Sequence, residues 1–185
     1  MPYLYGAARQ AHEHGWPMLR GMLLEFPDDP ACDYLDLQYM LGDSLLVAPV
    51  FSHDGVVNYY VPAGRWTSLL DGKVIEGPRW VRETHDYMSL PLLVRPNSVI
   101  PVGSNTERPD YDYSKDVTLR IYELESGKRV KTEIPSTEGN IATRFDIWRE
   151  GDNLHIKRTG EPKGWQILLV NIHSVEPAAA RIGSR

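Results

Sequence analysis

The stretch of sequence that decides the fold runs through residues 18–50 and reads MLRGMLLEFPDDPACDYLDLQYMLGDSLLVAPV. Its first part, residues 18–26, is a short apolar run followed by turn-forming residues, which favours a buried strand over a helix. Asp29 then precedes Pro30, the pattern of a helix N-cap and first turn, and we expect this helix to end at Gly42. Residues 45–50 predict a second buried strand. A parallel strand, helix, strand unit of this kind needs a larger sheet to cover both of its faces.

A helix is predicted before this stretch, over residues 2–15. Leu4, Ala7 and Ala11 recur at helical spacing, and Gly15 suits the end of the helix.

After residue 45 the pattern changes to short strands separated by turns. Asp71-Gly72 is the strongest hairpin signal in the chain. The polar segment 104–116, which contains proline and aspartate, predicts a boundary between two sheet units. The tail 177–185 is rich in alanine and has no pattern, so we expect it to lack fixed structure. Strands are predicted at 57–61, 65–69, 79–82, 92–94 and 99–102 before the boundary, and at 117–123, 129–134, 142–148, 154–157 and 166–172 after it.

Several of these segments resemble one enzyme family. EFPDDP (25–30), QYMLGD (38–43) and VAPV (47–50) resemble the end of the catalytic barrel in family 31 glycoside hydrolases. Residues 22–43 look most like the bacterial α-xylosidase branch of that family. YVPAGRWT (60–67) and VRPNSVIP (94–101) are similar to its first C-terminal β-domain. The resemblance covers residues 2–113 well and the rest more weakly.

The resemblance implies a mainly β fold in three parts. Residues 1–45 would be the end of a catalytic (β/α)8 barrel, built as helix, strand, helix. Residues 46–104 would form a proximal C-terminal β-sandwich domain. Residues 105–185 would form a distal one, which by comparison with the family stops a few strands early.

The resemblance also implies an activity. Family members hydrolyse a terminal non-reducing α-xylosyl or α-glucosyl unit by a retaining route through two aspartates, without metal or organic cofactor. Those aspartates, and the histidine and arginine of the sugar subsite, lie upstream of the part that this chain matches. We therefore expect no catalytic, cofactor-binding or metal residue here, no activity of the chain alone, and the missing catalytic barrel as its partner. Lys131-Thr132-Glu133 echoes the family's nucleophile motif only superficially.

Composition narrows the choice of partners and location. The 185 residues are 42% hydrophobic and carry a net charge of −5, without a dense basic patch, so we expect no nucleic-acid partner. No apolar run approaches the roughly 20 residues of a membrane helix, and no signal peptide opens the chain. These features predict a cytoplasmic protein that does not bind membranes.

The densest group of candidate catalytic side chains is a carboxylate cluster. Two of these groups could in principle form a glycosidase pair, at about 5–5.5 Å for retention or about 6.5–9.5 Å for inversion. The structural alternative, which we favour, makes Asp29 a helix cap, leaves Asp28 in the turn and puts Asp33 and Asp36 on a solvated face. The cluster consists of Glu25, Asp28, Asp29, Asp33 and Asp36.

Histidines offer two further metal hypotheses, and both have a structural alternative that we favour. His12 and His14 stand two apart on the predicted helix, so they point to different faces. Asp152 and His155 lack a third ligand nearby in sequence, and read as a turn aspartate and a strand histidine. His53 and His85 flank turns, with no partner identifiable from the sequence.

Two tryptophans and the single cysteine can also be interpreted as either functional or structural residues. Trp66 and Trp80 could stack on sugar rings, but their alternating strand positions favour burial. Cys32 excludes an internal disulfide and reads as a small apolar residue.

Two alternative functions stay open at this point. One is a non-catalytic carbohydrate-binding or assembly module built on β-sandwiches. The other is a small separate enzyme that uses the Asp28 and Asp29 region.

The resemblance predicts self-association through residues 1–45. Without the rest of a barrel, residues 1–45 would expose apolar side chains, and such patches drive partner binding or self-association. We therefore expect a homo-oligomer that forms through this segment. The side chains concerned are Leu19, Met22, Leu23, Leu24, Leu35 and Met40.

Overall fold

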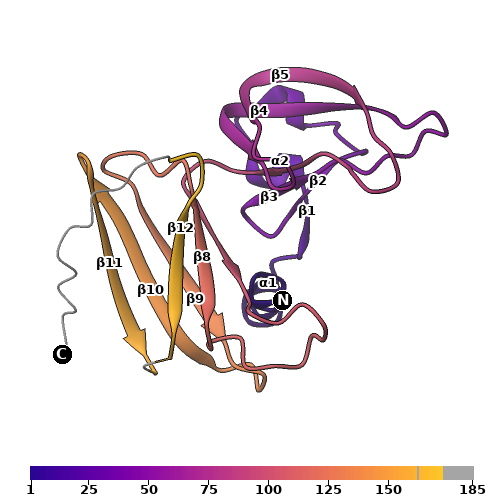
Figure 1. Cartoon of the computed structure of the whole chain (residues 1–185). Coiled ribbons are helices and arrows are strands. Elements are labelled where there is room, and N and C mark those ends of the chain that lie inside the picture. The colour runs from indigo at the N-terminus through magenta and orange to yellow at the C-terminus, as the bar shows by residue number, and fades with distance from the viewer. Residues whose placement is uncertain (162, 173–185) are drawn as a thin grey trace.

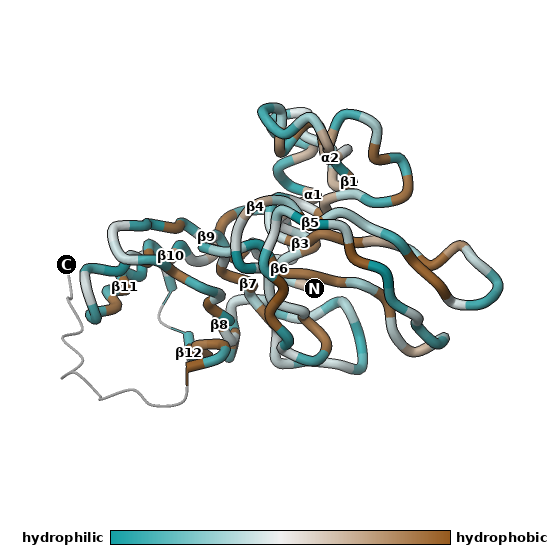
Figure 2. Tube along the Cα trace, turned by 90° about the horizontal axis from the view of Figure 1, so that it is seen from above, coloured by the Kyte–Doolittle hydropathy of each residue, from teal (hydrophilic) through white to brown (hydrophobic). Residues whose placement is uncertain are grey.

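The computed structural model describes residues 1–161 and 163–172 of the chain. They form a proximal part and a distal part that lie side by side, with helix α1 between them (Figures 1 and 2). Strands joined mostly in antiparallel fashion make up most of both parts, so the predicted mainly β fold is confirmed. The tail predicted to lack fixed structure, 177–185, lies outside the described residues.

Helix α1 spans Pro2–His14, as predicted, and connects both parts of the molecule. It ends at Gly15, whose φ of 72° places it in the left-handed region that glycine tolerates best. On one side the Tyr3 hydroxyl donates to the Leu41 carbonyl in the proximal part at 2.6 Å. On the other side the Tyr5 hydroxyl donates to the Thr137 carbonyl in the distal part at 3.2 Å.

The proximal part is built on one six-stranded antiparallel sheet. Its core packs Met22, Met40, Tyr59 and Trp66 together, all of them fully buried. In spatial order the strands are β1 (Leu19–Gly21), β2 (Tyr39–Leu41), β3 (Leu45–Val47), β6 (Leu92–Val94), β4 (Val56–Ser68) and β5 (Val74–Thr84).

The predicted Asp71-Gly72 hairpin is confirmed and joins β4 to β5. Both strands are longer than predicted, because β4 continues through Pro62 with only a shift of register between Val61 and Gly64. A β-carbon on Gly77 of β5 would lie 2.0 Å from the Pro62 carbonyl oxygen. Only glycine allows the two backbones to approach this closely.

The helix predicted over residues 30–42 is wrong. Only Pro30–Cys32 is helical, as the 3₁₀ turn η1, and the chain then becomes β2. Gln38 gives the physical reason: its amide donates to the Tyr60 carbonyl at 2.8 Å and accepts from the Tyr60 N–H at 2.7 Å. These bonds to a distant strand, together with the β2 ladder, override the weak local helix propensity of the segment.

The strand predicted over residues 18–26 is correct only for β1. Met22–Glu25 turns instead into the short helix α2, which buries Met22. Since β1, β2 and β3 pair antiparallel and join the proximal sheet, the expected parallel strand, helix, strand unit is also wrong. The order helix, strand, helix predicted for residues 1–45 is present as α1, β1 and α2, but η1, β2 and β3 follow it.

The distal part is a sandwich of two three-stranded sheets. Val117, Leu119, Ile134, Phe145 and Ile147 from the facing sheets form its core. One sheet consists of β11 (Asn153–Gly160), β10 (Ile141–Glu150) and β9 (Arg129–Pro135), and the other of β12 (Trp165–Leu169), β8 (Val117–Tyr122) and β7 (Ser98–Val102). All five strands predicted after residue 116 are present, and β12 pairs with β8 in parallel.

The change from one sheet to the next falls earlier than predicted. Strand β7 pairs with β8, so segment 104–116 connects two strands of the same sheet rather than two sheet units. The chain crosses between β6 and β7, where Asn97 has a φ of 59°. The Asn97 side-chain oxygen accepts from the Glu125 N–H at 2.8 Å, which fixes this crossing to the distal part.

Among the residues that the structure describes, no helix is both long and apolar enough to cross a bilayer.

Candidate functional site

Glu25, the first member of the carboxylate cluster, is held between two arginines. Its carboxylate accepts from Arg20 at 2.6 Å and from Arg95 at 2.9 Å. Arg20 is almost fully buried and also donates to the Pro17 carbonyl and to Gln10. Glu25 therefore joins β1 to the segment at which the chain crosses between the two parts, and its charge is compensated.

Asp29 caps η1, as predicted, although that helix is only one turn long. Its carboxylate accepts from the Ala31 N–H at 3.1 Å and from the Tyr60 hydroxyl at 2.8 Å. Burial, together with this bond to a carboxylate, raises the pKa of Tyr60 to about 12.

The other three carboxylates of the cluster are exposed, so the structural reading of the cluster fits their positions. Asp33 and Asp36 follow η1 on the surface, and Asp28 lies in the turn. A shallow hollow of about 260 Å³ lies beside Asp28 and is lined by residues 25–29 with Pro62 and Ala63. Glu25 and Asp29, which also line it, are committed to the internal contacts above.

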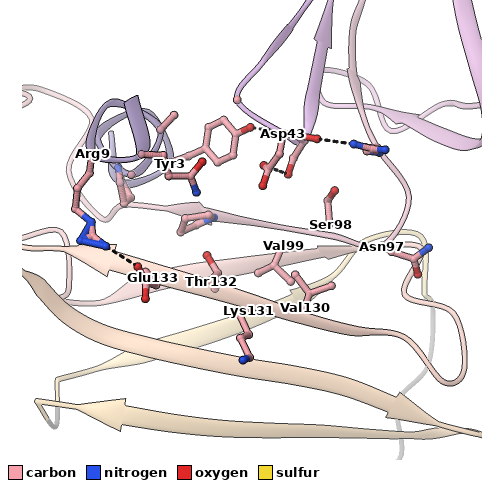
Figure 3. Close-up of a pocket in the computed structure, with 18 of the residues that line it drawn as sticks. Tyr3, Arg9, Asp43, Asn97, Ser98, Val99, Val130, Lys131, Thr132 and Glu133 are labelled. Carbon is pink, nitrogen blue, oxygen red and sulfur yellow. Dashed lines mark hydrogen bonds and ion pairs between the residues drawn. The ribbon is translucent and has the colours of Figure 1, made fainter. Parts of the chain in front are cut away.

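A larger cavity lies under α1 at the open edge of the distal sandwich, where β7 and β9 are the edge strands (Figure 3). We call it the sandwich-edge cavity. It has a volume of about 520 Å³. Its lining includes Asp43 and Tyr3 above, Val99 and Val130 below, and Ser98 and Asn97 toward one end. No local sequence pattern marks Asp43 or Ser98 as site residues, because only the tertiary fold brings them together.

Tyr3 fixes the roof of this cavity. Its hydroxyl accepts from the Ser44 N–H at 3.1 Å while it donates to Leu41, so α1 and the β2–β3 turn hold each other. Burial, with the nearby Asp43 carboxylate, raises the pKa of Tyr3 above its ordinary value. The hydroxyl therefore stays protonated and keeps both bonds at neutral pH.

The histidines do not gather into a metal site in the described part of the chain, where no three histidine, cysteine, aspartate or glutamate side chains cluster suitably. His12 and His14 occupy the last turn of α1. His155 stacks on Trp148 with ring centroids 5.0 Å apart, whereas Asp152 lies near Arg149 instead. His85 contacts Glu83 at 2.9 Å and Ser89 at 3.1 Å, and His53 is exposed.

The predictions for Trp66 and Cys32 are confirmed, whereas the prediction for Trp80 is wrong. Trp66 is fully buried, as predicted, and donates to the Pro62 carbonyl at 2.9 Å. Trp80 is mostly exposed and lies against the Tyr60 ring, so its predicted burial is wrong. Cys32 is buried, which confirms the prediction that it acts as a small apolar residue.

Lys131, Thr132 and Glu133 lie on β9, and Glu133 forms ion pairs with Arg9 and Arg144.

Several large apolar side chains of the segment between α1 and β2 are exposed. Leu19, Leu23 and Leu24 are exposed, as predicted, whereas Met22, Met40 and Leu35 pack in or against the proximal core. We use the name apolar face for the set of exposed apolar side chains in this segment. They are Trp16, Leu19, Leu23, Leu24, Tyr34 and Leu37.

Two consecutive family models match this sequence. Residues 15–100 match the glycosyl hydrolase family 31 C-terminal domain, and residues 112–183 match the C-terminal domain of alpha-xylosidase YicI. Together the two matches span most of the chain.

Known proteins with similar sequences and structures agree with these matches. Alpha-xylosidase XylQ of Lactiplantibacillus pentosus is 39% identical over 164 residues, which are 86% of this chain and 21% of that protein. An alpha-xylosidase of Emericella nidulans is 48% identical over 117 residues, 59% of this chain and 15% of that protein. The crystal structure of a GH31 alpha-xylosidase from Xanthomonas citri superimposes with a TM-score of 0.73 and 26% identity, over 91% of this chain and 20% of that one.

This chain thus spans about a fifth of the length of the relatives that it matches. Both of its parts correspond to C-terminal domains, and the remaining length of the relatives includes the catalytic domain of a larger enzyme. The chain therefore belongs to glycosyl hydrolase family 31, as a C-terminal portion of a member of that family.

Proposed function

We propose that this chain is the non-catalytic C-terminal part of a retaining α-glycosidase that hydrolyses terminal non-reducing α-xylosyl, or alternatively α-glucosyl, residues. The observation that supports the proposal most is the pair of consecutive family matches, one of them to an alpha-xylosidase domain. Both relatives named above, at 39% and 48% identity, are alpha-xylosidases, which favours xylosyl over glucosyl.

Retaining hydrolysis requires two carboxyl groups about 5–5.5 Å apart, one as nucleophile and one as acid and then base. We place both groups on the catalytic domain rather than on this chain. The contacts of the carboxylate cluster support this placement. Glu25 is neutralised by Arg20 and Arg95, and Asp29 is occupied by Ala31 and Tyr60. A nucleophile held in such contacts would have to break them before it could attack a sugar.

The proposed role of the chain is to brace the catalytic domain through the apolar face. Large exposed apolar side chains on adjoining segments mark an interaction surface, because leaving them in water is unfavourable. In this proposal the catalytic domain of the same enzyme covers Leu19, Leu23 and Leu24, which removes that cost.

The substrate is tested with the enzyme that contains this chain. We expect kcat/KM for p-nitrophenyl α-D-xyloside to exceed that for the α-D-glucoside. A preference for the glucoside would select the α-glucosidase alternative, and inactivity on both would refute the proposal.

The bracing role is tested by a matched pair of substitutions in the same enzyme. Leu24 on the apolar face and Leu70 in the β4–β5 hairpin are 59% and 55% exposed, so Leu→Ser should cost little at either if both face water. We expect Leu24→Ser to lower the thermal midpoint of the enzyme and Leu70→Ser to leave it unchanged. Equal effects would show that the catalytic domain does not cover Leu24.

A second candidate function is a saccharide-binding module, which the exposed ring of Trp80 supports. Saturable binding of xylose that Trp80→Ala abolishes would favour it. The cytoplasmic location and the homo-oligomeric state stay predictions, to be checked by cell fractionation and by light scattering.

A further inference from the structure

The sandwich-edge cavity contains polar groups that the fold itself does not use. Ser98 is only 5% exposed as a residue, but its hydroxyl is not among the fully buried unpaired atoms of the described residues, so this oxygen is open to the cavity. Figure 3 shows its side chain rising from β7 toward the turn that carries Asp43. The hydroxyl can therefore donate to, and accept from, a molecule that enters the cavity.

Asp43 is the second such group. Its carboxylate accepts from the Ser44 hydroxyl at 2.6 Å and forms no ion pair in the part of the chain that the structure describes. The nearby Arg95 donates to the Asp43 backbone carbonyl at 3.3 Å, but its charge is directed to Glu25. Asp43 thus retains carboxylate lone pairs that can accept hydrogen bonds from a ligand.

The remaining charges of the cavity disfavour an anionic ligand. Arg9 is held by Glu13 and Glu133. The Lys131 side chain points away from the cavity in Figure 3, and Lys128 is exposed to solvent. The Asp43 carboxylate would repel an anion, and Arg9 and Arg95 are already paired with glutamates.

The floor and one end of the cavity add complementary features. Val99 and Val130 supply apolar contact surface below the polar roof. Asn97 uses its oxygen to accept from Glu125, which leaves its NH₂ group available as a donor. The volume of about 520 Å³ lies within the range of roughly 300–1,000 Å³ that small-molecule sites occupy.

We infer that the sandwich-edge cavity binds a neutral, hydroxyl-rich molecule of monosaccharide or disaccharide size. Asp43 accepts from ligand hydroxyls, Ser98 both donates and accepts, and the valine floor contacts the C–H face of the ring. Binding to this cavity can be measured without turnover.

The test is a titration of the 185-residue chain with D-xylose, D-glucose and maltose, followed by NMR or calorimetry. We expect saturable millimolar binding of at least one of them. Ser98→Ala and Asp43→Asn should each weaken it about fivefold or more, the effect of losing one hydrogen bond of roughly 1 kcal/mol. Ser98→Ala removes a hydroxyl without a protein partner, so the variant should fold normally. Ser104→Ala, on the surface outside the cavity, is the matched control and should bind like the unmodified chain.

Three outcomes would overturn the inference. One is the absence of saturable binding to all three sugars. Another is binding that Ser98→Ala and Asp43→Asn leave unchanged while Trp80→Ala abolishes it, which would move the site to the β4–β5 sheet. The third is tighter binding of inorganic phosphate or of an alkylammonium ion than of any sugar. Because the experiment measures binding alone, its failure leaves the proposed glycosidase function untouched.

Discussion

The Glu25 ion pairs provide a stability prediction whose magnitude follows from burial. Glu25 accepts from Arg20 at 2.6 Å, and these side chains are 14% and 3% exposed. Arg65 and Glu76 form a second pair at the same 2.6 Å, but there the side chains are 54% and 67% exposed. The two pairs therefore have equal length and different solvation.

Glu25→Gln keeps the size of the side chain and removes its charge. It leaves Arg20 buried without its counterion, and such losses cost about 3–5 kcal/mol; because the amide can still accept one hydrogen bond, we expect about 3 kcal/mol. Glu76→Gln should cost less than about 1 kcal/mol, since water already solvates both partners. For a chain of this size the first change corresponds to a fall in the thermal midpoint of about 6–12 °C.

The assay is urea unfolding followed by circular dichroism, with both variants measured at the same low concentration. Hydrogen exchange provides a second readout, since Arg95 also donates its N–H to the Ser44 carbonyl at 2.8 Å. Glu25→Gln should speed exchange at that amide and Glu76→Gln should not. Equal losses of stability in the two variants would refute the argument that burial, rather than distance, sets the value of an ion pair here.

Three further predictions concern single side chains. Trp66→Ala should cost about 3–5 kcal/mol in urea unfolding because the ring is fully buried, while Trp80→Ala should cost much less; similar losses would contradict the observed exposure. Burial, with Asp29 and Asp33 nearby, raises the pKa of the Cys32 thiol to about 11. A thiol reagent at pH 8 should therefore label Cys32 only slowly until urea unfolds the chain. Rapid labelling of the folded protein would contradict this prediction. The hydrogen bond from Lys73, with one from Ser68, lowers the pKa of Asp71 to about 2. The Asp71–Lys73 pair therefore stabilises the fold above about pH 4, and this contribution is lost as the pH falls toward 2. The pair is exposed, so the loss should stay below about 1 kcal/mol, and Asp71→Asn should remove that part of the acid dependence; an unchanged acid profile in this variant would count against it.

Local sequence chemistry predicted the parts of the fold that short-range interactions determine. Asp71-Gly72 set the hairpin because glycine accepts the φ of 74° that Gly72 adopts there. The alternation of Val117, Leu119 and Ile121 predicted a strand with one buried face, and all three are buried in β8. Asp29 was identified as a cap because its side chain needs only an N–H two residues away.

The errors occur where distant partners decide the structure. Residues 30–42 carry helix signals at both ends, but Gln38 binds Tyr60, 22 residues along the chain, and Met40 pairs in a ladder with Leu46. The sequence places β7 at the end of the proximal part, but in the structure β7 pairs with β8 and belongs to the distal part. Trp80 has an alternating strand position, but β5 is an edge strand of the proximal sheet and this residue is 61% exposed.

Of the candidate site, the sequence predicted the structural role of Asp29 but not the sandwich-edge cavity. Asp43 comes from a turn of the proximal part, Ser98 from an edge strand of the distal part, and α1 lies above both. No spacing along the chain places these three elements together, because the contacts of Tyr3 and Tyr5 with the two parts determine their arrangement.

In the function that we propose, this chain supports a glycosidase without performing its chemistry. The most direct measurement is the release of p-nitrophenol from p-nitrophenyl α-D-xyloside by the purified 185-residue chain. We predict a rate equal to that of a buffer blank, at every protein concentration. Turnover that rises with protein concentration and disappears in Asp28→Asn would contradict the claim and place a catalytic carboxylate on this chain.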